Sequence, residues 1–264
     1  MKSGNRYAIC FAIVLAALTL TCTNVQAAVS SFNQAINMAG KQRMLTQRIV
    51  KNYILIGMDV DRDNAKEQLM LDIAAFEQQL EDLFQFSKSS EAKSKLQKVK
   101  ALWAPFRSLA MKKPTREGAT RLLKLDDELL SKTDSVVIQL QSESGTKSAK
   151  IVNVSGRQRM LTQRIAKYYL SNAWEVRRED DTSHMELAVQ DFKNAMQELK
   201  AYEKNSGAVT KMLNLVDANW AMFERNYSEN NGEYIPLLVS ISSNTILTTM
   251  DKVTDIYASQ DGNK

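Results

Sequence analysis

Two arginines, Arg43 and Arg159, occupy equivalent positions in a stretch that the chain contains twice. Residues 42–49 and 158–165 are identical, at an offset of 116. A guanidinium group is planar and always charged, and its paired N–H donors fit the oxygens of a small anion. Because this stretch is the least diverged part of the duplication, it is the first candidate for a functional site, and the chemistry it favours is anion binding.

The helical wheel places each arginine on a face that is apolar except for glycine, arginine and glutamine. This face comprises Ile36, Gly40, Arg43, Gln47, Val50 and Ile54 in the first copy, and Val152, Gly156, Arg159, Gln163, Ala166 and Leu170 in the second. The core of the first bundle is expected to take a different stripe: Met38, Leu45, Ile49, Tyr53 and Ile56. The residues expected to face water are Asn37, Lys41, Arg48 and Lys51. A helix with two apolar faces needs two partners, so the arginine face should meet another helix.

Burying either arginine on such a face is unfavourable without an anionic partner. No Asp or Glu occurs between Ala27 and Asp59 or between Ala149 and Glu175, so neither arginine-bearing helix can supply the counter-charge itself. A bound anion would supply it. The alternative is that the arginines reach solvent along the helix, and that the stretch is repeated because its packing is tight.

The elements that must position these residues are helices, because apolar residues recur at spacings of three and four and alternating strand-like runs are missing. We expect eight of them, four in each repeat. The expected ranges are Ser30–Ile56, Arg62–Phe86, Glu91–Met111, Thr115–Gln141, Lys147–Glu175, Thr182–Glu203, Gly207–Tyr227 and Tyr234–Ala258.

Four long helices with short loops are typical of an up-down-up-down bundle, so the expected fold is all-α, with two tandem four-helix bundles packed side by side. We assign residues 28–143 to the first bundle and 144–264 to the second. The connector around Gly145 is short and polar, so the second bundle should turn back beside the first and point the same way. That arrangement places Gly40 and Gly156 at the same height.

The first 27 residues have the pattern of a secretory signal peptide: Lys2 and Arg6, a short apolar run, and a small residue at the expected cleavage point, Ala27. We expect an exported, periplasmic protein. Lipid attachment at Cys22 is the less favoured alternative. Both cysteines of the chain lie in this segment, so no disulfide is expected in the mature protein.

Other chemistries find little support in the composition. The net charge of +5 is scattered, which does not favour nucleic acid as a partner. With His184 as the single histidine and no cysteine after residue 27, neither a metal site nor a catalytic constellation is expected. We therefore expect no enzyme activity and no cofactor.

The repeated stretch resembles the P-box of the PilJ/NarX-like sensor domains, a family that includes the periplasmic parts of nitrate/nitrite sensor kinases and the N-terminal domain of type IV pili chemotaxis transducers. The motif Asn-x-Ala-Gly-x-x-Arg-Met is matched by residues 37–44. The second copy matches at residues 153–160, except that Ser155 replaces the alanine.

The resemblance implies a four-helix bundle in which one nitrate lies between two P-box helices, contacted by the motif's glycine and arginine from two subunits. Carried over, the anion-binding residues are Gly40, Arg43, Gly156 and Arg159. Asn37, Gln47, Asn153 and Gln163 are expected to support them.

Two functions follow as hypotheses. The first is a sensory or binding protein for a small anion, nitrate or nitrite by resemblance, that signals to a membrane-bound receptor or kinase. The second is an interaction module without a small ligand, in an envelope or type IV pilus-linked signalling assembly. For the first, one chain carrying both P-boxes predicts an internal pseudo-dimer with one anion, and a homodimer with two separate sites is the alternative.

Overall fold

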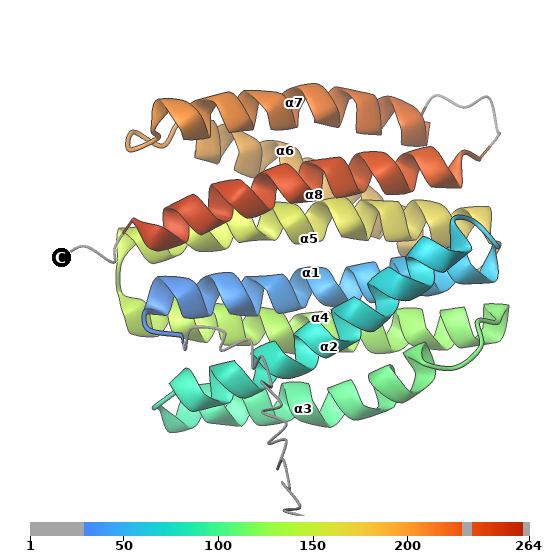
Figure 1. The fold of residues 1–264 in the computed structure, drawn as a ribbon, viewed down its shortest axis with the longest axis horizontal. Coiled ribbons are helices and arrows are strands. Elements are labelled where there is room, and N and C mark those ends of the chain that lie inside the picture. Colours follow the sequence, from blue (N-terminus) through green and yellow to red (C-terminus); the bar gives the residue numbers. More distant parts are fainter. Residues whose placement is uncertain (1–28, 229–233, 261–264) are drawn as a thin grey trace, which may run out of the picture.

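In a computed structural model that describes residues 29–228 and 234–260, the chain forms eight α-helices and, within these ranges, no strand (Figure 1). The helices are α1 (Phe32–Gly57), α2 (Arg62–Phe86), α3 (Ser90–Ala110), α4 (Arg116–Ser144), α5 (Lys147–Ala173), α6 (Asp181–Lys200), α7 (Gly207–Ser228) and α8 (Pro236–Ser259). The expected all-α fold is confirmed. The largest differences at helix ends are at α4, which continues to Ser144 rather than ending at Gln141, and at α6, which ends at Lys200 rather than at Glu203.

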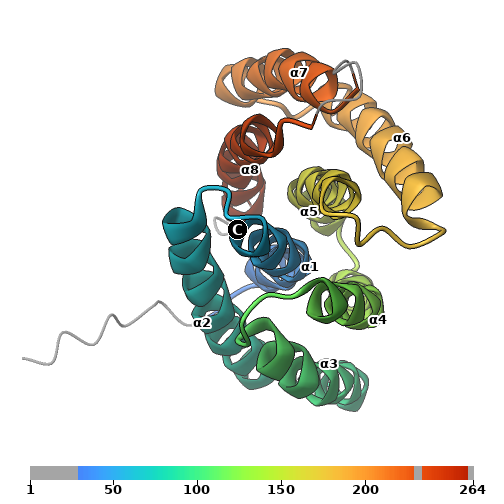
Figure 2. The ribbon, with the colours of Figure 1, turned by 90° about the vertical axis from the view of Figure 1, so that its right-hand side faces the viewer.

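The helices form two bundles, which are joined by the contact between the first helix of each, α1 and α5. In the first repeat α1 packs against α2 and α4, and α3 packs against α4; in the second repeat α5, α6, α7 and α8 repeat this pattern. The most extensive contact in the molecule is between α1 and α5, which lie side by side at its centre and run in the same direction (Figures 1 and 2). The pairs α2–α3 and α6–α7 form the two outer ends (Figure 2).

The turn between the repeats explains why the bundles lie side by side. Gly145 ends α4 in the left-handed conformation, with φ of 63°, where a glycine avoids the steric clash of a Cβ. Thr146 then caps α5 by accepting a hydrogen bond from the Ala149 N–H at 3.2 Å. Two residues therefore reverse the chain, which places α5 against α1. The domain boundary between residues 143 and 144 stays a prediction.

The same aromatic pair supports each bundle. Phe76 stacks on Trp103 with ring centroids 3.9 Å apart, and Phe192 stacks on Trp220 at 4.0 Å. All four side chains are buried. This repeated packing shows that the duplication extends well beyond the arginine stretch.

Gly57, at the end of α1, gives a first testable prediction. A Cβ built on Gly57 would overlap the bulky Trp174 ring at the end of α5. Gly57→Ala should therefore lower the free energy of unfolding by about 1–3 kcal/mol, the usual range for overpacking. Urea unfolding measures it. Gly207→Ala is the matched control, since nothing lies within 4 Å of its added Cβ. An equal effect of both changes would refute the contact.

The predicted signal peptide, residues 1–27, lies outside the described residues. Among the helices that the structure describes, none combines the length and the apolar character needed to span a bilayer.

Candidate anion site at the helix pair

The two arginines predicted from the repeat meet at the interface of α1 and α5. A Cβ built on Gly40 would lie 3.3 Å from Nη2 of Arg159 and 3.5 Å from Nη2 of Arg43. One built on Gly156 would lie 3.1 Å and 3.9 Å from the same two nitrogens. The exposed fractions of Arg43 and Arg159 are 1 % and 0 %. The structure thus brings together Gly40, Arg43, Gly156 and Arg159; whether they bind an anion stays a prediction.

The glycines make room for the guanidinium groups. Both lie inside helices with ordinary helical backbone, so alanine would be tolerated by the chain itself. An added methyl group would instead press on the Nη2 atoms, most closely on Arg159 from Gly156. Each small residue therefore provides the space in which the arginine of the other repeat, as well as its own, can lie between the two helices.

Carboxylates of the protein itself balance both charges, so the expected bound anion is not needed as the counter-charge. Arg43 Nη1 donates to Asp134 of α4 at 2.6 Å, and Arg159 Nη1 donates to Asp251 of α8 at 2.5 Å. The carboxylates come from the fourth helix of each repeat and not from the helices that carry the arginines. These side chains are 42 % and 39 % exposed, so each ion pair joins a buried cation to a carboxylate at the surface.

The remaining contacts of the arginines cross from one repeat to the other. Arg43 Nη2 donates to Asn153 Oδ1 at 2.8 Å, and Arg159 Nη2 donates to the main-chain oxygen of Asn37 at 3.2 Å. Asn153 is thus part of the site through its side-chain oxygen, and Asn37 through its main-chain oxygen. Asn37 uses its side-chain amide to donate to Asp255 at 2.7 Å instead.

Each guanidinium retains an unused donor. Among the described side chains, Arg43 Nε and Arg159 Nε are buried and have no hydrogen-bond partner. The Nε–Nη2 edge is the one that Arg48 presents to the two oxygens of Asp72. A buried donor without a partner is unfavourable by about 1–3 kcal/mol, so an acceptor that reached these edges would gain that energy.

Burial and the neighbouring carboxylates act on the pKa values of the two arginines in opposite directions. Burial lowers the pKa of Arg43 and of Arg159, and the paired carboxylates oppose that change. Arg157 and Arg159 also contribute to the lowered pKa of Arg43, as expected for like charges close together. Although burial acts in the other direction, Arg159 and Lys41 lower the pKa of Asp251. Both arginines remain charged, held by one carboxylate each.

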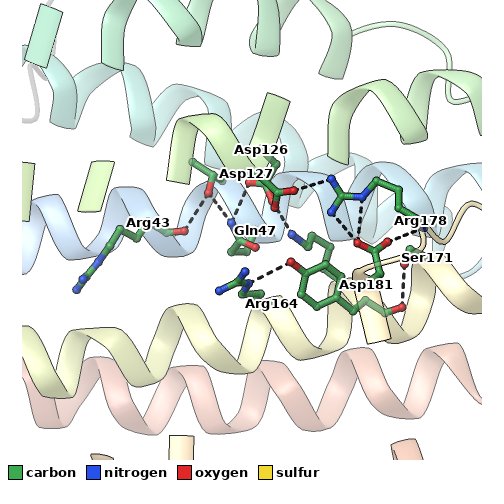
Figure 3. Close-up of polar contacts among 11 residues, drawn as sticks. Arg43, Gln47, Asp126, Asp127, Arg164, Ser171, Arg178 and Asp181 are labelled. Atoms are coloured by element: carbon green, nitrogen blue, oxygen red, sulfur yellow. Dashed lines mark hydrogen bonds and ion pairs between the residues drawn. The ribbon is translucent and has the colours of Figure 1, made fainter. Parts of the chain in front are cut away.

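The two predicted supporting glutamines lie elsewhere. Gln47 Nε2 donates to Asp126 Oδ1 at 2.9 Å (Figure 3), and Gln163 Nε2 donates to the main-chain oxygen of Ser243 at 3.2 Å. Both face the fourth helix of their own repeat, one turn beyond the arginines. Among the described residues, no hydrogen bond joins these glutamines to the arginines, so nothing supports their predicted role beside the anion.

Two buried lysines were missed by the sequence interpretation. Lys51 was expected to face water, but it and its equivalent Lys167 are both fully buried. The wheel treated α1 as having one neighbouring bundle and one partner helix, whereas α8 also packs on α1 and covers Lys51. Lys167 is paired with buried Asp126 at 2.6 Å. Although burial opposes it, Asp126 raises the pKa of Lys167.

A second charged cluster fixes the start of α6 to α4. Arg178 donates to Asp127 of α4 at 2.5 Å and to Asp181 at 2.6 Å, as Figure 3 shows. Although burial raises it, the neighbouring cations Lys167 and Arg178 lower the pKa of Asp127. This cluster has its charges matched and is best explained as a structural clamp between the repeats.

One surface cleft lies close to the arginine pair. Its volume is about 320 Å³, and its lining includes Asp134, Arg157, Arg164 and His184. Asp134, the carboxylate paired with Arg43, is thus reached from solvent through this cleft. In the described part of the chain, no group of three or more His, Cys, Asp or Glu side chains could hold a metal ion.

Comparison with known proteins places the chain in a family. The family described as type IV pili methyl-accepting chemotaxis transducer N-terminal domain, PilJ, matches residues 27–127 and again residues 140–254. No curated protein and no solved structure matches the chain. The two matches cover both repeats and include both arginine stretches, so this chain belongs to the PilJ family of sensor-type domains and carries that domain twice.

Proposed function

We propose that this protein is an exported sensory protein that binds one small oxyanion, of the nitrate or nitrite class, between α1 and α5, and that it signals to a membrane-bound partner. The observation that supports the proposal best is the meeting of Arg43 and Arg159, both buried, over Gly40 and Gly156. Export rests on the N-terminal segment described above, and the signalling role rests on the PilJ family.

A planar oxyanion suits the donors that the two arginines leave unused. Each guanidinium presents a buried Nε without a partner, beside an Nη2 that makes one cross-repeat hydrogen bond. Two such edges on neighbouring helices can share one anion with several acceptor oxygens. The anion would replace like-charge repulsion between the helices by attraction to a common partner.

The carboxylates give this site two alternative states. Without the anion, Asp134 and Asp251 balance the arginines; with it, one or both can turn to the water that already reaches them. Since α4 and α8 carry these carboxylates, binding would change how the fourth helices are held against the central pair. A ligand shifts such an equilibrium only by its difference in affinity for the two states.

A second candidate function is favoured by the same ion pairs. Because each buried arginine already has a carboxylate, the interface needs no ligand for charge balance. The protein would then be an interaction module of a signalling assembly, and the arginines would serve to hold α1 and α5 in register.

Thermal unfolding in the presence of oxyanions separates these functions. A ligand that binds only the folded state stabilises it by about 2.7 kcal/mol at a hundred times its Kd. We expect nitrate or nitrite to raise the Tm of residues 28–264 in a saturable way, and equal ionic strength in sodium gluconate to have no such effect. If no oxyanion raises the Tm above the gluconate control, the interaction module is the correct function.

Asp134→Asn tests whether the anion competes with a carboxylate. The change keeps the shape but removes the charge that balances Arg43, so the unliganded protein should lose about 1–3 kcal/mol of stability. Nitrate should then bind about tenfold more tightly, which corresponds to about 1.4 kcal/mol. Asp191→Asn is the control, because it removes a half-exposed partner of Arg157. Unchanged or weaker nitrate binding by Asp134→Asn would exclude competition.

A further inference from the structure

The interface between α1 and α8 contains a buried cation without a carboxylate. Lys51 Nζ donates to Asn244 Oδ1 at 2.7 Å and to Ser243 Oγ at 3.4 Å, and both acceptors are neutral. Among the described residues, no carboxylate lies within ion-pair distance of this nitrogen. Such a charge is strongly unfavourable in the interior unless something balances it.

The equivalent cluster, which the duplication relates to this one, shows what is missing. There Lys167 Nζ contacts the Asp126 carboxylate at 2.6 Å, and Gln47 Nε2 donates to the same carboxylate at 2.9 Å. Asp126 corresponds to Ser243, at the offset that relates Trp103 to Trp220. Around Ser243, a lysine of the first repeat, Lys51, and a glutamine of the second repeat, Gln163, therefore surround a position that holds a carboxylate in the equivalent cluster.

The donors of that carboxylate are still present. Gln163 is fully buried and directs its Nε2 to the main-chain oxygen of Ser243 at 3.2 Å, next to the position in question. Serine lacks one carbon and the second oxygen of aspartate, so a ligand that took the place of the missing carboxylate would have to be small. A chloride-sized anion fits that difference better than a carboxylate ligand does.

We propose that Lys51 and Gln163 bind one chloride-sized anion beside Ser243, separate from the arginine pair, in the position that the Asp126 carboxylate takes in the other repeat. The site is independent of the proposed oxyanion function, because it lies between α1 and α8 and uses neither arginine. The anion would balance the buried charge of Lys51 where α1 packs against α8 of the second bundle.

The charged groups around Lys51 make this binding depend on pH. Burial, with a contribution from Arg48, lowers the pKa of Lys51 to about 7, and Asp72 of α2 acts in the other direction. Asp72 is itself occupied by Arg48, and α8 contributes only Ser243 and Asn244. An anion binds the protonated amine, so its apparent affinity should fall about tenfold for each pH unit above 7. The arginine pair would show no such change.

Thermal unfolding of residues 28–264 in sodium chloride, against sodium gluconate at equal ionic strength and pH 6, tests the site. Chloride should raise the Tm of the unmodified protein in a saturable way, and the rise should be lost at pH 9. Ser243→Asp should raise the Tm in gluconate and abolish the chloride response, because the new carboxylate fills the site. Lys51→Met should abolish the response too, whereas Arg43→Ala should retain it.

Two results would overturn the proposal. One is a chloride response of Ser243→Asp equal to that of the unmodified protein. The other is the lack of an anomalous peak in contact with Lys51 Nζ in crystals grown in sodium bromide at pH 6. If nitrate does not raise the Tm, the oxyanion function fails but the chloride site does not. The Lys51 and Ser243 variants test the chloride site, whereas the arginine variants test the oxyanion site.

Discussion

Replacing Lys51 by methionine is expected to stabilise the protein at pH 7 in gluconate, whereas the same replacement at the equivalent Lys167 is expected to destabilise it. Lys51→Met removes a buried cation whose neutral partners have other options: Ser243 Oγ already donates to Ser240 O at 2.8 Å, and Asn244 is partly exposed. Lys167→Met instead leaves the Asp126 carboxylate buried without its cation. We expect a gain of about 1–4 kcal/mol for the first change and a loss of about 3–5 kcal/mol for the second.

The pH dependence of unfolding gives the same prediction an independent readout. The pKa of Lys51 is lowered from 10.5 to about 7 in the folded protein. Between these values the unfolded chain binds the proton and the folded chain does not. The free energy of unfolding should therefore rise as the pH increases from 7 to 10.5, and Lys51→Met should remove that part of the rise.

Urea unfolding at several pH values measures both effects. The control for Lys167→Met is a second change, Asp126→Asn, which removes the unpaired charge and should recover part of the lost stability. Equal effects of the two lysine changes, in size and sign, would mean that the asymmetry between Asp126 and Ser243 has no energetic consequence.

Replacing either Arg43 or Arg159 alone by alanine is expected to abolish the Tm rise in nitrate. The two guanidinium groups act on one anion, so each single change removes half of its donors and leaves a carboxylate, Asp134 or Asp251, without its buried partner. These carboxylates are partly exposed and can hydrate, so the fold should survive. We expect nitrate affinity to fall at least about a hundredfold, or about 2.7 kcal/mol.

Arg107→Ala is the matched control for these changes, because Arg107 of α3 is partly exposed and pairs with Glu77 of α2, away from the contact of α1 with α5. Its nitrate response should stay close to that of the unmodified protein. Far-ultraviolet circular dichroism shows whether each variant is folded. If each single arginine change preserves half of the binding capacity at the original affinity, the two arginines serve separate sites.

Much of the fold could be predicted from the sequence because the duplication and the helical spacing are both strong signals. The contact of α1 with α5 followed from one physical argument, namely that Gly40 and Gly156 lie on a second apolar face that must be covered. The short turn at Gly145 then left few ways to arrange the bundles.

The charge balance of the site could not be predicted in the same way. The carboxylates that pair with the arginines lie about ninety residues further along the chain, on α4 and α8. Asp134 and Asp251 are separated by the same 117 residues as Trp103 and Trp220, but a helical wheel says nothing about which distant helix supplies a partner. Lys51 was placed in water for the same reason, since only the packing of α8 on α1 covers it.

The most direct test of the central claim is the number of nitrate ions that one chain binds. Isothermal titration of residues 28–264 with sodium nitrate, on protein whose mass is measured by light scattering, gives that number. We predict a monomer that binds one nitrate, because Arg43 and Arg159 of the same chain share it. A chain that binds two nitrates, or a dimer in which binding needs two chains, would contradict the internal pseudo-dimer.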